Sequence, residues 1–179
     1  MIVLGLVVGH GNSALDEWFF GASYAVLGGH PTWMLALNRV WFLVSLLVLA
    51  VGIALWRRQW RLAAVAGLCP VISIAGSRTL KVLFGRPWSD DALAYPSGHT
   101  TVAITVLAML VLVIGIRVWT VAVGSIAALV PSIGMASNHF HYFTDIIGGV
   151  LYATSMVCLA LLAAGPDALA RSLGRPRSD

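Results

Sequence analysis

Residues Tyr95–Ile116 read YPSGHTTVAITVLAMLVLVIGI. After the polar turn Pro96-Ser97-Gly98-His99, no charged residue follows as far as Ile116, and most side chains are apolar. A helix needs about 17 to 25 predominantly apolar residues to cross a bilayer. We therefore expect a membrane span from about His99 to Ile116, with Ser97 as its N-cap.

The composition of the whole chain favours a membrane protein. Of the 179 residues, 59% are hydrophobic and 10% are charged, whereas a soluble domain usually has about a quarter charged residues. The net charge is +4, but the basic residues lie in short gaps between apolar runs. This pattern carries information on membrane topology and argues against a nucleic-acid partner.

Besides this helix, the chain contains four further apolar runs, at about Leu37–Trp56, Leu62–Leu80, Val118–Met135 and Asp145–Ala164. Residues 14–28 begin with acidic residues and continue with aromatic ones, which is typical of a helix lying at the membrane interface. The run Met1–Val8 is apolar but too short to span. We expect an all-α, polytopic membrane helix bundle with five full spans, a short N-terminal stub and an interfacial helix.

This arrangement predicts one membrane domain over residues 1–165 and a basic tail over residues 166–179. The loop 57–61, Arg117 and the tail fall on one side of the membrane and hold most of the Lys and Arg residues. The positive-inside rule places that side in the cytoplasm. The polar stretches 81–98 and 136–145 then lie together on the opposite, extracytoplasmic face.

The pair His141 and Asp145 lies in the second polar stretch, and the two residues are four positions apart. On a helix they share one face, where a carboxylate can fix the tautomer of an imidazole and stabilise its charged form. A nucleophilic or general-base histidine needs such a partner. The alternative is an aspartate favoured by the dipole of a helix N-terminus, with an incidental histidine beside it.

The first polar stretch combines an anion-binding pattern with two cations. The free N–H groups at the helix start after Gly98 can bind an anion, and His99 would stand beside it. Lys81 and Arg86 suit a phosphate on the same face. The alternatives are an ordinary serine cap with a Pro-Gly turn and a lysine that snorkels at the end of a span.

Together these residues indicate phosphoryl transfer. One histidine would attack phosphorus, while the other would protonate the leaving oxygen and then activate water. Cations and backbone N–H groups would hold the remaining phosphate oxygens. We expect neither a metal nor another cofactor, because His139 and His141 are only two apart and no third ligand has suitable spacing.

These motifs resemble those of the type 2 phosphatidic acid phosphatase superfamily. The resemblance covers about residues 35–165 and rests on three segments: Leu80-Lys81 with Phe84-Gly85-Arg86-Pro87, Tyr95-Pro96-Ser97-Gly98-His99-Thr100, and His141-Tyr142-Phe143-Thr144-Asp145 followed by Gly148-Gly149. It implies a metal-free phosphohistidine mechanism acting on lipid phosphates or diphosphates. By this resemblance His141 is the nucleophile, Asp145 its partner and His99 the general acid and base. The phosphate ligands it implies are Lys81, Ser97 and the N–H of Gly98.

Two arginines of the family pattern are absent from their usual positions, which hold Trp88 and Met135. A phosphate dianion short of two cations would bind more weakly. We expect Arg86 to compensate, with Asn138 or His139 as further donors.

The sequence therefore predicts a plasma-membrane lipid phosphatase for a lipid or polyprenyl phosphate or diphosphate. One alternative is a catalytically impaired lipid-binding or interaction protein on the same scaffold, suggested by the missing arginines. Another alternative is a small transporter or channel subunit. Its charged residues would be expected near the membrane midplane, whereas here they cluster on one face. The particular lipid and the oligomeric state stay open.

Overall fold

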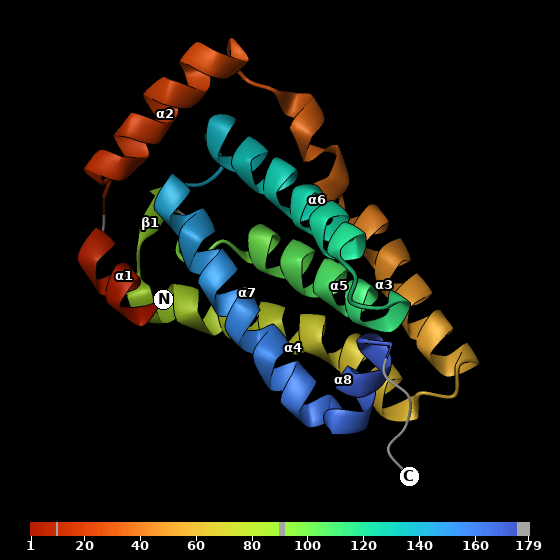
Figure 1. Ribbon diagram of the computed structural model, residues 1–179. Helices are drawn as coiled ribbons and strands as arrows, with labels where there is room; N and C mark the ends of the chain where they lie inside the picture. Colours follow the sequence, from red (N-terminus) through yellow and green to blue (C-terminus); the bar gives the residue numbers. More distant parts are fainter. Residues whose placement is uncertain (10, 90–91, 175–179) are drawn as a thin grey trace.

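The computed structural model describes residues 1–9, 11–89 and 92–174. It is a helix bundle in which α5 (Gly98–Ile114) runs through the middle, as Figure 1 shows. Four other helices surround and contact α5: α3 (Val40–Trp56), α4 (Trp60–Phe84), α6 (Val118–Ser137) and α7 (Phe143–Ala164). Small buried residues let these helices approach closely, among them Ala54, Ala63, Ala66, Ala160 and Ala164.

The prediction of an α-helical membrane bundle is confirmed in its general form. Among the described residues, four helical segments are long and apolar enough to cross a membrane: Thr32–Trp56, Trp60–Phe84, Val118–Ser137 and Phe143–Ala164. The central helix α5 is also apolar, but its 17 residues extend only about 26 Å at 1.5 Å per residue. The hydrocarbon core is about 30 Å thick, so the count of five full spans stays a prediction.

The N-terminal segment forms two short helices across one end of the bundle, α1 (Ile2–Val8) and α2 (Ala14–Leu27). Helix α2 starts with a capping box, in which Ser13 and Asp16 satisfy each other's backbone N–H groups. It packs against α6 and α7. The expected helix near residues 14–28 is therefore present, while its position at a membrane interface stays a prediction.

Several elements were not expected from the sequence. The segment before α3 is a 3-10 helix, η1 (Thr32–Asn38), and α4 continues past Leu80 to Phe84, where Gly85 (φ 60°) ends it in the left-handed conformation. A small antiparallel hairpin follows, formed by β1 (Pro87–Ser89) and β2 (Ala92–Leu93).

Part of the predicted tail is also helical, as α8 (Pro166–Ser172). The Ser172 hydroxyl donates a hydrogen bond to the Leu112 carbonyl at 2.7 Å, which fixes α8 to the end of α5. The end of the predicted tail, residues 175–179, lies outside the described residues.

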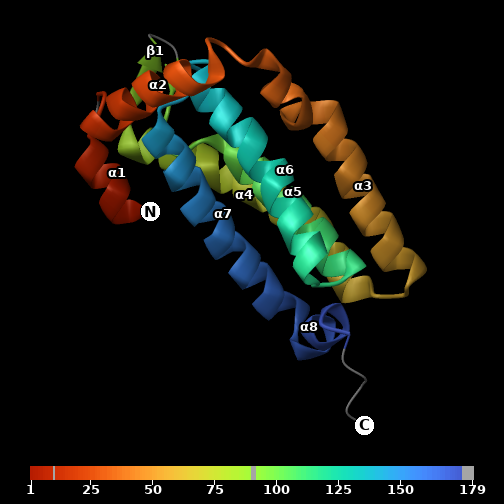
Figure 2. The same ribbon diagram turned by 45° about the horizontal axis from the view of Figure 1, so that its top comes forward.

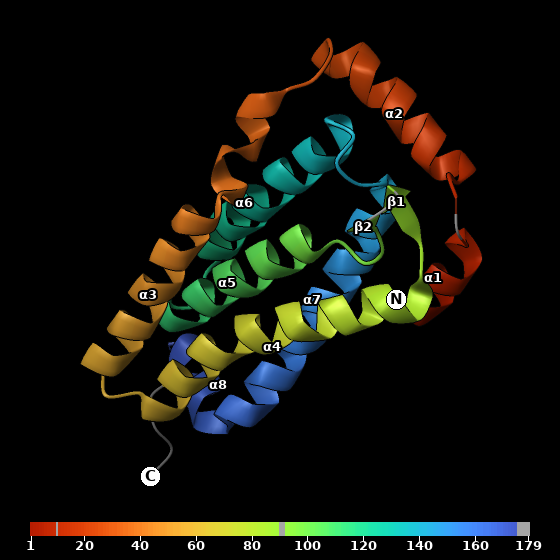
Figure 3. The same cartoon turned by 180° about the vertical axis from the view of Figure 1, so that it is seen from behind.

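The two polar stretches meet at one end of the bundle, as expected. This end contains the starts of α5 and α7 and the ends of α4 and α6 (Figure 3). The Ser97 N–H donates to the Asp145 carbonyl at 3.0 Å, which ties the two stretches together. The loop between α3 and α4 lies with α8 at the opposite end (Figure 2).

Candidate active site

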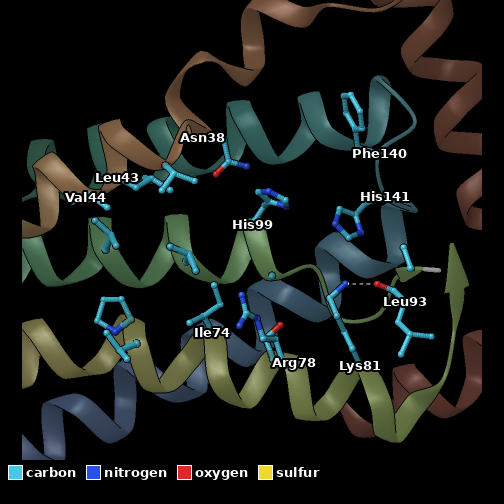
Figure 4. A pocket seen from close by; sticks show the side chains of 18 of the residues that line it. Asn38, Leu43, Val44, Ile74, Arg78, Lys81, Leu93, His99, Phe140 and His141 are labelled. Atoms are coloured by element: carbon cyan, nitrogen blue, oxygen red, sulfur yellow. Dashed lines mark hydrogen bonds between the residues drawn. The ribbon is translucent and has the colours of Figure 1, made fainter. Parts of the chain in front are cut away.

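A cavity of about 700 Å³ opens between α3, α4 and α5 at the polar end of the bundle. Its polar lining comes from Asn38, Ser77, Arg78, Lys81, Gly98, His99 and His141. The rest of the wall is largely apolar and includes Val40, Leu43, Val44 and Leu47 of α3, and Pro70, Val71 and Ile74 of α4. The cavity therefore combines a polar end with an apolar extension along the helices (Figure 4).

The two histidines face the same space from different helices. His99 lies in the first turn of α5, and His141 lies just before α7. Their ring centroids are 6.1 Å apart, and both side chains line the cavity. The structure therefore brings together the two histidines that were predicted for acid-base and nucleophilic work.

Asp145 lies behind His141, on the side away from the cavity wall. Its Oδ2 atom is 3.5 Å from His141 Nδ1 and accepts the Tyr142 N–H at 3.0 Å. His141 is buried, and its Nδ1 has no hydrogen-bond partner within the described chain at this distance. The carboxylate lies on the Nδ1 side of the ring, which suits the predicted orienting role.

Arg86 was expected to bind phosphate, but its side chain does not line the cavity. Its guanidinium is fully buried and pairs with Asp145 Oδ1 at 2.8 Å and Asp16 Oδ2 at 2.9 Å. It also donates to Thr144 Oγ1 and the Gly11 carbonyl, each at 2.7 Å, and lies over the Tyr142 ring. Arg86 thus joins α2 to the carboxylate behind His141, and its binding to phosphate stays a prediction.

Lys81 reaches the cavity from the last turn of α4. Its ammonium donates to the Leu93 carbonyl at 2.5 Å and the Ala94 carbonyl at 2.8 Å. An ammonium group has three donors, so one is left for a bound anion. The carbonyls of the β2 segment hold this charge below His141 (Figure 4).

The turn Pro96-Ser97-Gly98-His99 starts α5 as the sequence predicted. The Ser97 hydroxyl accepts the Thr100 N–H at 3.4 Å as the N-cap, and its side chain is fully buried. Gly98 lies on the cavity wall, close to Ser77. The Gly98 position therefore fits the predicted anion site, whereas Ser97 acts as a helix cap.

The two residues expected as further donors lie outside the cavity lining. Asn138 Nδ2 donates to the Gly134 and Pro31 carbonyls at the end of α6. His139 packs against Phe20 of α2 and His30. Both connect the N-terminal segment to the bundle, and their contribution to phosphate binding stays a prediction.

The two positions where the family pattern has arginine differ in their surroundings. Trp88 lines the cavity and packs edge-on against Tyr142, with 4.7 Å between ring centroids. Met135 is buried in an apolar cluster with Ala136 and Ile146. Neither position supplies a cation, so the positive charge of the cavity must come from elsewhere.

Sequence reasoning missed three cavity residues: Asn38, Ser77 and Arg78. Arg78 and Ser77 precede Lys81 by three and four positions, so they share its helix face, and this spacing could have identified them. Asn38 stood at the start of an expected span, where a polar side chain tends to mark function. No acidic side chain belongs to the described lining, so the site carries a positive charge from Lys81 and Arg78.

Within the described ranges, no group of three His, Cys, Asp or Glu side chains is close enough to hold a metal ion. The family model described as PAP2 superfamily matches residues 60–166. No curated protein and no solved structure matches the chain. The matched region contains the cavity residues of α4, α5 and the start of α7, while Asn38 and the cavity residues of α3 lie before it.

Proposed function

The chain belongs to the PAP2 superfamily, and we propose that it is a membrane lipid phosphatase acting through a phosphohistidine intermediate. Members of this superfamily are phosphatases, and the four apolar segments suit a membrane enzyme. The proposed substrate is a lipid or polyprenyl phosphate or diphosphate, whose chain stays in an apolar environment.

One observation carries the proposal: His99 and His141 face each other at the polar end of a cavity whose other walls are apolar. A phosphate between the rings would meet Lys81 and the N–H groups at the start of α5. The apolar walls of α3 and α4 would receive the chain of the same molecule. A headgroup and chain arranged in this way are typical of a lipid phosphate.

In the proposed reaction, His141 is the nucleophile and His99 is the general acid and base. His141 attacks phosphorus through Nε2, because its Nδ1 faces Asp145. The bond from phosphorus to the leaving oxygen breaks, and His99 gives its proton to that oxygen. His99 then removes a proton from water, which attacks the phosphohistidine and releases inorganic phosphate and neutral His141. Asp145 stabilises the positive charge on the His141 ring during the first step.

The direct test is release of inorganic phosphate from lipid phosphates by the purified protein in detergent. We expect His141→Ala to abolish turnover and His99→Ala to lower it by at least about 100-fold, as general acid-base catalysis contributes about that much. Quenching turnover with alkaline detergent, in which a phosphorus–nitrogen bond survives, should trap phosphate on wild-type protein but not on His141→Ala. If both variants kept the wild-type rate, the assignment would be wrong.

A second candidate is a lipid-binding protein that has lost turnover. It is favoured by Arg86, whose guanidinium is occupied by two carboxylates, and by Trp88 and Met135 at the positions of two arginines. This alternative predicts that lipid phosphates bind while no phosphate is released. A phosphohistidine trapped on the wild-type chain would exclude it.

A further inference from the structure

We propose that Arg78, Asn38 and Ser77 form a subsite for the leaving group, which adapts this cavity to lipid diphosphates in preference to monophosphates. The inference rests on the proposed function and narrows its substrate class. In a lipid diphosphate the terminal phosphate is transferred, and the leaving group is itself a charged lipid monophosphate.

Asn38 and Ser77 have buried polar atoms without hydrogen-bond partners among the described residues, which indicates a ligand site. Asn38 is 7% exposed, and neither its Nδ2 nor its Oδ1 has a hydrogen-bond partner among the described residues. Ser77 is 1% exposed, and its hydroxyl is likewise unpaired there. Buried polar groups without partners cost about 1 to 3 kcal/mol each and are rare in folded proteins. Since both side chains line the cavity, a polar ligand group inside it would satisfy them.

The order of residues along the cavity assigns the subsite to the leaving group. Figure 4 shows Lys81 below His141 at one end, and Arg78 below His99 further along. Asn38 lies on the far side of His99 from His141, and the apolar residues Leu43 and Val44 follow. With His141 as the nucleophile and His99 beside the leaving oxygen, Arg78 and Asn38 lie between the bond that breaks and the lipid chain.

The charge of this subsite suits a phosphate better than a neutral linker. Arg78 has no carboxylate partner in the part of the chain that the structure describes, and no described lining residue is acidic. A guanidinium binds phosphate oxygens through paired N–H groups, and an amide such as Asn38 can donate to another oxygen. A lipid monophosphate would place an uncharged ester chain at the same position and leave the guanidinium unpaired.

Hydrolysis of a lipid diphosphate at this site uses the same two histidines. Nε2 of His141 forms a bond to the terminal phosphorus, and the bond from this phosphorus to the bridging oxygen breaks with its electron pair on that oxygen. His99 donates a proton to the oxygen as the lipid monophosphate leaves. Arg78 and Asn38 hold this second phosphate and offset the charge that develops on it. Water then hydrolyses the phosphohistidine, with His99 accepting the water proton.

The experiment compares kcat/KM for a polyprenyl diphosphate and the monophosphate with the same chain, in one detergent. We expect Arg78→Ala to lower the ratio of diphosphate to monophosphate kcat/KM by about 10- to 100-fold, the range for a lost charged hydrogen bond. Arg78→Lys keeps the charge but not the paired donors, so the ratio should recover in part. Arg39→Ala removes an exposed arginine that does not line the cavity and should leave both constants unchanged.

A second pair of variants tests the buried amide. Asn38→Asp places a negative charge beside the proposed second phosphate, so it should lower the diphosphate constant more than Asn38→Ala does. An equal loss on both substrates, or no change in the ratio with Arg78→Ala, would overturn the subsite while leaving the phosphatase assignment intact. If the wild-type protein hydrolysed neither lipid, the proposed function itself would fail, and the inference with it.

Discussion

Gly148 and Gly149 of α7 determine how closely this helix approaches the turn that starts α5. A Cβ atom on Gly149 would lie 2.8 Å from the Ser97 carbonyl oxygen, and one on Gly148 would lie 2.3 Å from the Tyr95 ring. Real Cβ contacts are not this short, so any other residue would separate the two elements. The glycine pair therefore lets the start of α7, which carries Asp145, lie close to the turn that precedes His99.

We expect Gly149→Ala to lower kcat by about 10- to 100-fold, because a shift of about 1 Å between reacting groups costs that much. Overpacking against a backbone atom should also lower the free energy of unfolding by about 1 to 3 kcal/mol. Gly52→Ala is the control, since a Cβ there meets nothing within 4 Å. Phosphate release and unfolding in detergent measure the two effects; equal behaviour of the two variants would contradict this role for Gly149.

The sequence located the residues that line the cavity better than the residues that pack behind them. His99, His141, Lys81 and Gly98 were identified from local motifs and line one cavity. The pairing of Arg86 with Asp16 could not be predicted, because these residues are far apart in the sequence and no local pattern connects them. A guanidinium near a phosphate motif has the same sequence pattern whether it contacts phosphate or carboxylate.

Among the elements, helix α2 is joined to the bundle through one buried carboxylate, Asp16. Asp16 is fully buried and accepts the Thr144 N–H at 2.8 Å as well as the Arg86 guanidinium. Burial raises the pKa of Asp16, but the hydrogen bonds from Thr144, Ser13 and Arg86 outweigh it and hold the pKa below its usual 3.8. The ionised carboxylate therefore stabilises the docked helix.

The sign of the pH dependence follows from this lowered pKa. A carboxyl group with a lower pKa in the folded state contributes stability above the unfolded value, and this contribution is lost as pH falls through the folded value. We expect the thermal unfolding midpoint in detergent to fall as the pH drops below about 4. Asp16→Asn should flatten this acid-dependent part; an unchanged slope would rule out Asp16 as its source.

At neutral pH, Asp16→Asn should itself be destabilising by about 3 kcal/mol, because it leaves the buried Arg86 with one carboxylate fewer. Glu17→Gln removes a charge from the next position of the same helix, where the side chain is exposed. This control should change the free energy of unfolding by less than about 0.5 kcal/mol. Similar effects of the two variants would show that α2 is held by other contacts.

The long helices could be predicted because apolar runs carry a strong signal, and their observed bounds lie near the expected ones. The hairpin of β1 and β2 could not, since strands of three and two residues are too short for an alternating pattern. The extra turn of α4 is not evident from the sequence, because the charge of Lys81 favours the start of a polar loop there. Its position inside the helix is what aligns Ser77 and Arg78 with it.

Over the whole molecule, the two ends of the bundle differ in charge and in chemistry. The cavity opens near one end, whereas the other end groups Arg57, Arg58, Arg61 and Arg171 around a separate hollow. The positive-inside rule favours a cytoplasmic position for the arginine-rich end. We propose on this basis that the cavity faces the extracytoplasmic side of the plasma membrane.

Cysteine labelling tests this orientation. In a Cys69→Ala, Cys158→Ser background, Ser89→Cys lies on the exposed hairpin strand β1 and Arg171→Cys lies on α8. We expect a membrane-impermeant maleimide to label Ser89→Cys in intact cells and Arg171→Cys only after the membrane is opened. The reverse pattern would place the cavity in the cytoplasm.

The buried contact between Arg86 and its two carboxylates also couples the docking of α2 to the charge of the site. Asp16 and Asp145 together carry one more negative charge than Arg86 neutralises, and a positively charged His141 ring would restore the balance. When that ring attracts Asp145, the ion pair between Arg86 and Asp145 weakens, and the pair between Arg86 and Asp16 contributes more to neutralising Arg86. Coupling of this kind is reciprocal. If His141 is phosphorylated as proposed, the modified chain should therefore hold its N-terminal helix more tightly than the unmodified one.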